Sequence, residues 1–300
     1  MYAITGATGN TGRVVVDALL RRGQKVRAIA RNADRLRQAA AMGAEPFTVD
    51  LTDGESLARA FDGVRAVYVM MPPDMAAADY RAFQSRVVDA VKAALDATKV
   101  PYAVTLSSVG ADKSEKTGPI LGLHYMEEQL NQIRGLNVLH LRAGYFMENT
   151  LAMVGTIQSM GKAAGPLRPD VKLPMIASRD IGAAAAEELL GLKFKGRNTR
   201  ELLGERDISM AQATAIIGRA IGKPDLQYVQ LTDEQLRPAL EQMGFSANVA
   251  DLILEMSAAI NSGHIRALEP RSDRNTTPTS YEKFVAEVFV PLYRGRSAAG

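Results

Sequence analysis

Residues 2–12 read Tyr-Ala-Ile-Thr-Gly-Ala-Thr-Gly-Asn-Thr-Gly and place Gly6, Gly9 and Gly12 directly after four strand-forming residues. A helical run follows. At such a strand–turn–helix junction, glycines allow a sharp turn and a close approach of the backbone to a pyrophosphate, which the free N–H groups of the helix bind. The spacing is Gly-x-x-Gly-x-x-Gly, which differs from the Gly-x-Gly-x-x-Gly fingerprint. Its context predicts dinucleotide binding; the alternative is the same fold with an empty pocket.

Short β-rich runs alternate with amphipathic helical stretches through the first half of the chain, which is typical of a parallel sheet with crossover helices. We expect six strands: Tyr2–Thr5, Lys25–Ala30, Glu45–Asp50, Ala66–Met70, Tyr102–Leu106 and Asn137–Arg142. We expect connecting helices over Asn10–Arg22, Ala33–Met42 and Asp53–Phe61, each ended by a left-handed glycine: Gly23, Gly43 and Gly63. The predicted fold is therefore α/β, a Rossmann-type doubly wound parallel sheet.

The regular alternation stops after Arg142, where glycines, prolines and a helix-like run over Asn149–Met160 follow. Further on we expect helices at Arg179–Leu190, Ser209–Ile221, Asp233–Met243, Asn248–Ser262 and Tyr281–Tyr293, and a strand at Leu226–Leu231. These patterns predict a dinucleotide-binding domain over residues 1–146, to which 179–206 return. A smaller C-terminal α+β lobe over 147–178 and 207–300 is expected to hold the substrate. The tail Arg294–Gly300 is expected to be disordered.

Composition excludes several function classes. The 300 residues contain no cysteine, and the three histidines share no ligand spacing, so we expect no metal site, disulfide or thiol nucleophile. The net charge of +3 comes from 36 basic and 33 acidic residues, which does not indicate a nucleic-acid-binding surface. No apolar run reaches the roughly 20 residues of a membrane span, and we find no targeting segment ahead of Gly6. We therefore expect a cytoplasmic protein with no membrane or nucleic-acid partner; its oligomeric state is not readable.

The expected cofactor site lies along the carboxyl ends of the predicted strands. An acidic residue that binds an NAD ribose should close the second strand, but residues 30–32 are Ala-Arg-Asn. The Arg31 guanidinium can bind a 2′-phosphate, which favours NADP(H) over NAD(H); alternatively Arg31 is a solvated charge. Asp50 can accept from the adenine amino group or cap the next helix. The candidate cofactor-binding residues are Gly6, Thr8, Gly9, Asn10, Thr11, Gly12, Arg31, Asp50, Leu51, Met70, Met71, Pro72 and Ser107.

A flat apolar substrate is expected beside the nicotinamide, past the same strand ends. Two apolar stretches supply candidate walls, Met70–Pro73 and Tyr145–Met147, although local packing is the alternative for each side chain. Ser107 and Ser108 can hydrogen-bond the ribose or the carboxamide of the nicotinamide, or cap a turn. The candidate substrate-pocket residues are Pro73, Ser108, Tyr125, Tyr145, Phe146 and Met147.

The chain resembles the NmrA-like atypical short-chain dehydrogenase/reductases. The segments that carry the resemblance are Gly6–Gly12, Ala30–Asn32, Val49–Leu51, Leu106–Gly110, His124 with Glu127 and Glu128, and Leu141–Asn149. It covers residues 1–190 well and the C-terminal third weakly. The resemblance implies one of two functions. Some members are NADPH-dependent reductases of quinones, azo dyes or triarylmethane dyes, and others are redox sensors without catalytic activity.

The proton donor of carbonyl-reducing relatives is missing. Those enzymes use Tyr-x-x-x-Lys, in which the lysine lowers the tyrosine pKa, and none of the nine tyrosines here has a lysine four residues on. His124 is a weak candidate donor; pairing with Glu127 or Glu128 on one helix face is the alternative. His140 alternates within a buried strand, where we expect a structural role.

Hydride transfer remains possible without that acid, because quinones and azo bonds delocalise the incoming electron pair. We therefore predict an NADPH-dependent oxidoreductase that passes hydride to a small electron-accepting aromatic substrate of the quinone or azo type. The alternative is an NADP(H)-binding redox sensor that changes its protein contacts without turnover. A sensor requires different affinities for the oxidised and reduced cofactor.

Overall fold

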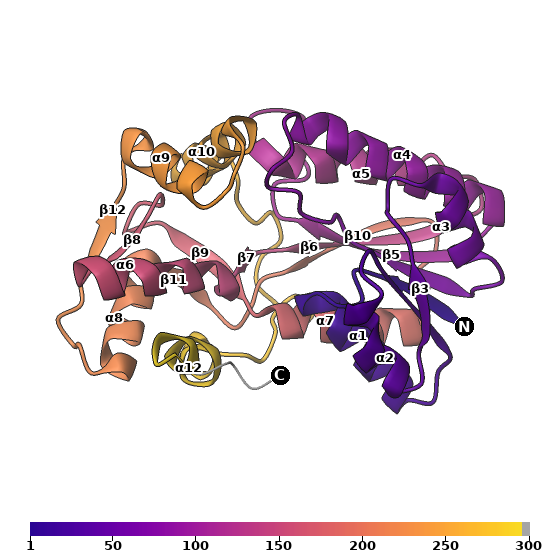
Figure 1. Ribbon diagram of the computed structural model, residues 1–300, viewed down its shortest axis with the longest axis horizontal. Coiled ribbons are helices and arrows are strands. Elements are labelled where there is room, and N and C mark those ends of the chain that lie inside the picture. Colours follow the sequence, from indigo (N-terminus) through magenta and orange to yellow (C-terminus); the bar gives the residue numbers. More distant parts are fainter. Residues whose placement is uncertain (296–300) are drawn as a thin grey trace.

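The glycine-rich turn follows β1, an inner strand of a seven-stranded parallel sheet in the computed structural model, which describes residues 1–295 (Figure 1). The order is β10-β6-β5-β4-β1-β2-β3, and every neighbouring pair is parallel. The strands are β1 (Tyr2–Thr5), β2 (Val26–Ala30), β3 (Glu45–Thr48), β4 (Ala66–Val69), β5 (Tyr102–Ser108), β6 (Asn137–Ala143) and β10 (Arg197–Leu202). The chain leaves β1 towards β2 on one side and returns to β4 on the other, so the switch point of a doubly wound sheet lies beside β1.

Helices cover both faces of this sheet (Figure 1). One face carries α1 (Asn10–Arg21), a 3₁₀ turn (Asp34–Leu36), α2 (Arg37–Ala41) and α7 (Ser178–Gly191); the other carries α3 (Gly54–Phe61), α4 (Tyr80–Thr98) and α5 (Leu121–Leu130). Each layer has its own apolar core, and β1 and β4 are buried on both faces, as expected for central parallel strands. The predicted Rossmann-type fold is confirmed.

The six predicted strands are all present: β1 has the predicted bounds, and each of the other five differs at one end by one or two residues. Gly23, Gly43 and Gly63 have φ of 69°, 98° and 67°, as predicted for left-handed helix ends. The seventh strand, β10, was not predicted. It is an edge strand with the sequence Arg-Asn-Thr-Arg-Glu-Leu, in which only the last two residues are buried, so it lacks the apolar run of a central strand.

A smaller lobe follows β6 and has its own core of mostly aliphatic and aromatic residues. Its sheets are β7 (Tyr145–Phe146), β9 (Lys172–Ile176) and β11 (Asp207–Ser209), and β8 (Ala163–Gly165) with β12 (Tyr228–Gln230). Its helices are α6 (Met153–Met160), α8 (Met210–Ile221), α9 (Asp233–Gln242), α10 (Ala247–Asn261), α11 (Tyr281–Phe284) and α12 (Val290–Tyr293). The α+β character is confirmed, whereas the predicted domain boundaries stay a prediction.

The observed structure differs from the predicted one in two details of the smaller lobe. Tyr145 and Phe146 pair with β9 and belong to the smaller sheet, although they fall within the predicted first domain. The predicted helix over residues 281–293 is continuous but contains a π-helical segment, Val285–Phe289, between α11 and α12. Of the tail predicted to be disordered, Arg294 and Gly295 form a turn, and residues 296–300 lie outside the described part of the chain.

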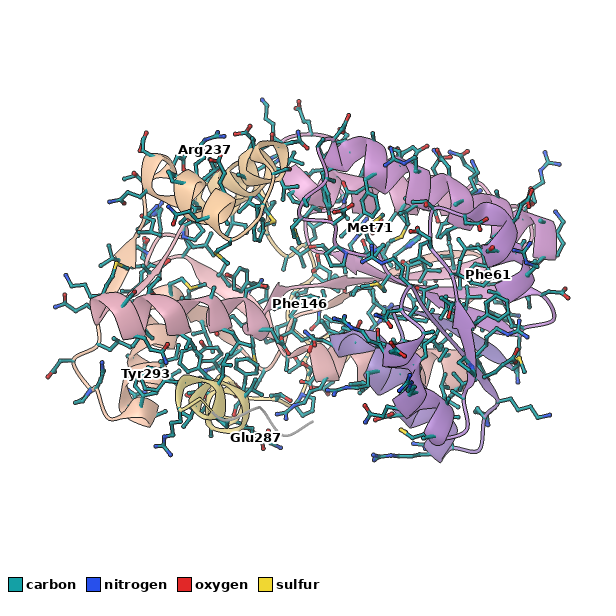
Figure 2. All side chains as sticks on the ribbon, in the orientation of Figure 1. Phe61, Met71, Phe146, Arg237, Glu287 and Tyr293 are labelled. Carbon is teal, nitrogen blue, oxygen red and sulfur yellow. The ribbon has the colours of Figure 1, made fainter. Side chains whose placement is uncertain are left out.

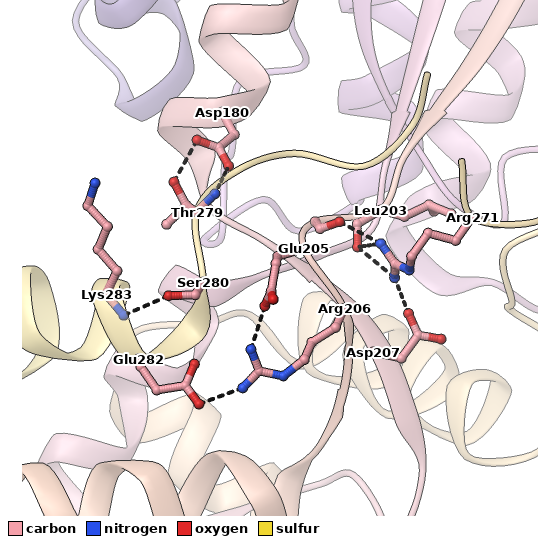
Figure 3. A network of polar contacts seen from close by, with 11 residues as sticks. Asp180, Leu203, Glu205, Arg206, Asp207, Arg271, Thr279, Ser280, Glu282 and Lys283 are labelled. Carbon is pink, nitrogen blue, oxygen red and sulfur yellow. Dashed lines mark hydrogen bonds and ion pairs between the residues drawn. The ribbon is translucent and has the colours of Figure 1, made fainter. Parts of the chain in front are cut away.

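The cross-lobe segment, residues 263–280, returns from α10 over the junction of the two lobes. The buried Glu201 carboxylate accepts the backbone N–H groups of Leu268 and Glu269 at 3.0 and 2.8 Å. Farther along, Thr279 donates its N–H and hydroxyl to buried Asp180 at 2.9 and 2.7 Å (Figure 3). These bonds fix the segment against β10 and α7. Within residues 1–295, no helix combines the length and apolar character that crossing a membrane requires.

Candidate active site

The turn between β1 and α1 has the geometry of a phosphate cradle. Gly6 has a φ of 60°, and a Cβ on Gly12 would lie 2.2 Å from the Gly6 carbonyl oxygen. Gly9 caps α1 without any side-chain hydrogen bond, and the first turn of α1 holds no acidic residue. The first amides of the helix therefore face outward with the positive end of its dipole. The turn fits a dinucleotide pyrophosphate, because Gly6, Gly9 and Gly12 carry no side chain that would hinder the approach of a phosphate.

A polar cavity of about 470 Å³ lies beside this turn, between α1 and α2. Thr8 lines it together with three arginines, Arg13, Arg35 and Arg37. Arg37 is paired with Asp34 at 2.6 Å, but within residues 1–295 neither Arg13 nor Arg35 has an acidic partner within 4.0 Å.

The structure adds two basic candidates for the 2′-phosphate to Arg31, which is exposed and does not line this cavity. Sequence reasoning missed both. The available signals were the position of Arg13 directly after Gly12 and that of Arg35 one helical turn after Arg31.

Asp50 and Leu51 follow β3. The Asp50 carboxylate accepts the Thr52 N–H at 2.9 Å and its hydroxyl at 2.8 Å, which forms a turn and ends the strand two residues earlier than predicted. Asp53, not Asp50, caps α3 by accepting the Ser56 N–H at 3.1 Å. The helix-cap interpretation of Asp50 is therefore wrong. Leu51 is buried in the core under α3, and the contact of Asp50 with adenine stays a prediction.

A larger cavity of about 550 Å³ lies past the carboxyl ends of β4, β5 and β6, at the junction of the lobes. Seven predicted residues line it: Met70, Met71, Pro73, Ser107, Ser108, Tyr145 and Phe146. Figure 2 shows Met71 on the side of the large sheet and Phe146 at the junction. Met70 also packs on the glycine turn, since a Cβ on Gly6 would lie 2.6 Å from its Sδ atom. The cavity therefore adjoins the glycine turn at the same edge of the sheet.

The far wall of this cavity comes mostly from the lobe that was expected to hold the substrate, although none of its wall residues was a named candidate. From the smaller lobe come Val171, Leu173, Pro174, Met256 and Ile260, and from the cross-lobe segment Ile265, Arg266 and Ala267. Tyr80 and Gln84 on α4 close another side. Because these side chains come from three separate stretches of sequence, 80–84, 171–174 and 256–267, no local motif indicates that they meet.

Tyr145 and Asn149 line the cavity together. Burial raises the pKa of Tyr145 to about 12, although the neighbouring Asn149 side chain acts in the opposite direction. The phenol is therefore neutral near pH 7 and can donate a hydrogen bond.

Four of the candidates expected at the substrate end of the site do not line this cavity. The Tyr125 hydroxyl donates to Asp89 on α4 at 2.8 Å, because this side of α5 faces α4. Met147 is buried in the core of the smaller lobe, and Pro72 is buried between Met71 and Pro73. His124 Nδ1 donates to the Ala111 carbonyl at 2.8 Å, and its Nε2 lies 3.5 Å from Glu128.

The helix-face pairing of His124 with Glu128 is thus the one that the structure shows. Both ring nitrogens have partners outside the cavity, so the geometry gives no support to His124 as a proton donor there.

The structure is a Rossmann-type α/β fold with an apolar cavity next to its glycine turn. The NmrA-like family model matches residues 2–284, and the chain belongs to this family. It is 29% identical over 262 residues to an NAD(P)H azoreductase of Xenophilus azovorans, covering 86% of each chain. It is 28% identical over 269 residues to quinone oxidoreductase 2 of Escherichia coli (strain K12), covering 88% of this chain and 89% of the relative.

Among solved structures, an NADPH-dependent quinone oxidoreductase from Escherichia coli complexed with NADPH superposes with a TM-score of 0.76 at 23% identity. The match covers 100% of this chain and 96% of the other. At this identity the likeness concerns the fold, including the smaller lobe.

Proposed function

We propose that this protein is an NADPH-dependent reductase that transfers hydride to an aromatic electron acceptor of the quinone or azo type. The observation that carries the proposal is the apolar cavity of about 550 Å³ that adjoins the glycine turn through Met70. A pocket of this size and character suits a flat ring placed against a nicotinamide. The azo and quinone reductases among the relatives support the same class of reaction.

In this proposal the amides at the start of α1 bind the pyrophosphate, while Arg31, Arg13 and Arg35 attract the 2′-phosphate of NADP(H). When bound, the nicotinamide supplies the hydride. Met70, Met71 and Phe146 hold the acceptor ring, and Tyr145 donates a hydrogen bond to an acceptor oxygen or nitrogen.

No strong acid is needed for this chemistry. A reduced quinone or azo bond spreads its negative charge and can take protons from water, whereas a simple ketone gives a localised alkoxide. The absence of Tyr-x-x-x-Lys from the sequence therefore favours delocalised acceptors over simple carbonyl compounds.

The test is NADPH oxidation by the purified protein with matched panels of quinones, azo dyes and simple ketones. We expect saturable turnover with at least one quinone or azo dye and none with the ketones. Turnover of ketones alone would contradict the proposal. Binding of NADPH and NADP⁺ with different affinities, without oxidation by any acceptor, would instead support the redox-sensor alternative.

A further inference from the structure

A buried ion pair lies directly behind one serine of the larger cavity. Ser107, at the end of β5, lines this cavity, and its Oγ donates to Glu127 Oε1 at 2.5 Å. Glu127, on α5, accepts both arms of the Arg142 guanidinium, from Nε at 3.0 Å and from Nη2 at 2.6 Å. Ser107 and Glu127 are only 2% and 5% exposed, so this network is shielded from water.

The fold explains why these three side chains meet. Ser107 and Arg142 are direct partners in the parallel β5–β6 register, so their side chains leave the sheet on the same face, the one that α5 covers. Glu127 projects from α5 onto this pair. Burial alone would lower the pKa of Arg142, but the hydrogen bond and the charge of Glu127 outweigh it and raise that pKa.

This arrangement fixes the direction of one hydrogen atom. A carboxylate accepts hydrogen bonds and has no hydrogen to give, so the single hydroxyl hydrogen of Ser107 is committed to Glu127. Only the lone pairs of Ser107 Oγ are left for a ligand. A buried ion pair adds little net stability compared with apolar packing, so its orienting effect is its clearest consequence at this position.

We propose that Glu127, held by Arg142, is a positioning residue that fixes the Ser107 hydroxyl as the hydrogen-bond acceptor for the carboxamide amine of the nicotinamide. The inference rests on the proposed function. Ser107 then accepts a hydrogen bond from the cofactor, and Glu127 acts on the cofactor only by orienting Ser107. Ser107 does not supply a proton to the reduced substrate.

The experiment compares NADPH with its reduced 3-acetylpyridine analogue, in which a methyl group replaces the carboxamide amine. Dissociation constants are measured in the absence of any quinone or azo dye, from the quenching of the fluorescence of the reduced cofactor. We expect the wild-type protein to bind NADPH about 10-fold more tightly than the analogue, the effect of one hydrogen bond to a polarised acceptor. Failure to reduce quinones would not affect this measurement.

Glu127→Gln tests the role of the carboxylate at nearly constant size. The glutamine side chain has one oxygen, which accepts from Arg142, so its amide NH₂ faces Ser107. The Ser107 hydroxyl then accepts from this NH₂, and its hydrogen turns towards the cavity. We expect the 10-fold preference to fall to about twofold or less. Glu128→Gln is the matched control, because this neighbouring residue on α5 pairs with His124 and not with Ser107. We expect this variant to keep the 10-fold preference for NADPH over the analogue.

Ser107→Ala is the second variant, since Glu127→Gln leaves Arg142 with a weaker partner and can destabilise the protein. Thermal unfolding shows which variants are folded, and Ser107→Ala should also lose the preference. An unchanged preference in folded Glu127→Gln or in Ser107→Ala would overturn the proposal. If the wild-type protein bound neither NADPH nor the analogue, the proposed function would fail and this inference with it.

Discussion

Replacement of Gly12 by alanine is the most local perturbation of the phosphate cradle. The new Cβ would lie 2.2 Å from the oxygen and 2.7 Å from the carbon of the Gly6 carbonyl, so this backbone must move by about 1 Å to reach van der Waals contact. Overpacking of this kind costs about 1–3 kcal/mol, which the better helix propensity of alanine offsets by up to about 1 kcal/mol. We expect a loss of about 1–2 kcal/mol in the free energy of unfolding.

The effect on cofactor binding should be larger. A 1 Å shift of the turn misaligns two amide bonds to phosphate oxygens, each of about 1.5 kcal/mol, so NADPH affinity should fall about 100-fold. Isothermal titration calorimetry and urea denaturation measure the two quantities. Gly155→Ala is the control, because Gly155 lies in α6 where an added Cβ would meet no atom within 4 Å, and this variant should gain about 0.5–1 kcal/mol with unchanged affinity. Wild-type NADPH affinity in Gly12→Ala would refute the assignment of this turn to the pyrophosphate.

Three further predictions follow from buried or unpaired charges. Burial lowers the pKa of His140 to about 4, so on acidification the unfolded chain binds a proton at this histidine before the folded protein does. The free energy of unfolding should therefore fall by about 3 kcal/mol from pH 7 to pH 4. Urea denaturation at each pH measures this fall, and His140→Gln should make it smaller. Glu201→Ala leaves two backbone N–H groups of the cross-lobe segment without their acceptor and should lower the unfolding free energy by about 2–3 kcal/mol, whereas no change in the urea midpoint would contradict the role of this carboxylate. Arg35→Asp and Arg31→Asp should each raise the KM for NADPH about 10-fold or more with little effect on NADH; an equal effect on both cofactors would exclude that arginine from the 2′-phosphate site.

The parts of the fold that could be predicted are those with local causes. The apolar runs of β1 and β4, the glycine turn and the helix-ending glycines each determine their own conformation, and the sequence shows them directly. β10 escaped prediction because its pairing with β6, rather than its own composition, makes it a strand.

The candidate site likewise has one part that the sequence predicted and one part that it did not. Met70, Met71 and Ser107 were identified because the carboxyl ends of parallel strands meet at one edge. The wall made by Ile260 and Ile265 depends on a chain return that no local pattern reveals.

Glu127 illustrates a different difficulty. The spacing to His124 allowed either Glu127 or Glu128 as a partner on the helix face. The structure pairs His124 with Glu128 and turns Glu127 inward, because Arg142 on β6 offers a buried guanidinium. The partner lies on another element, so helix periodicity could not distinguish the two carboxylates.

Hydride transfer to a quinone can be observed in a single-turnover experiment, in which the purified protein, loaded with NADPH, is mixed with a quinone and the loss of nicotinamide absorbance is followed by stopped flow. The same trace is recorded with each of the two NADPH stereoisomers deuterated at C4. We expect rapid protein-dependent oxidation that saturates with quinone and slows at least twofold with one deuterated stereoisomer only. Bound NADPH that stays reduced in the presence of every quinone and azo dye would rule out the proposed reductase function.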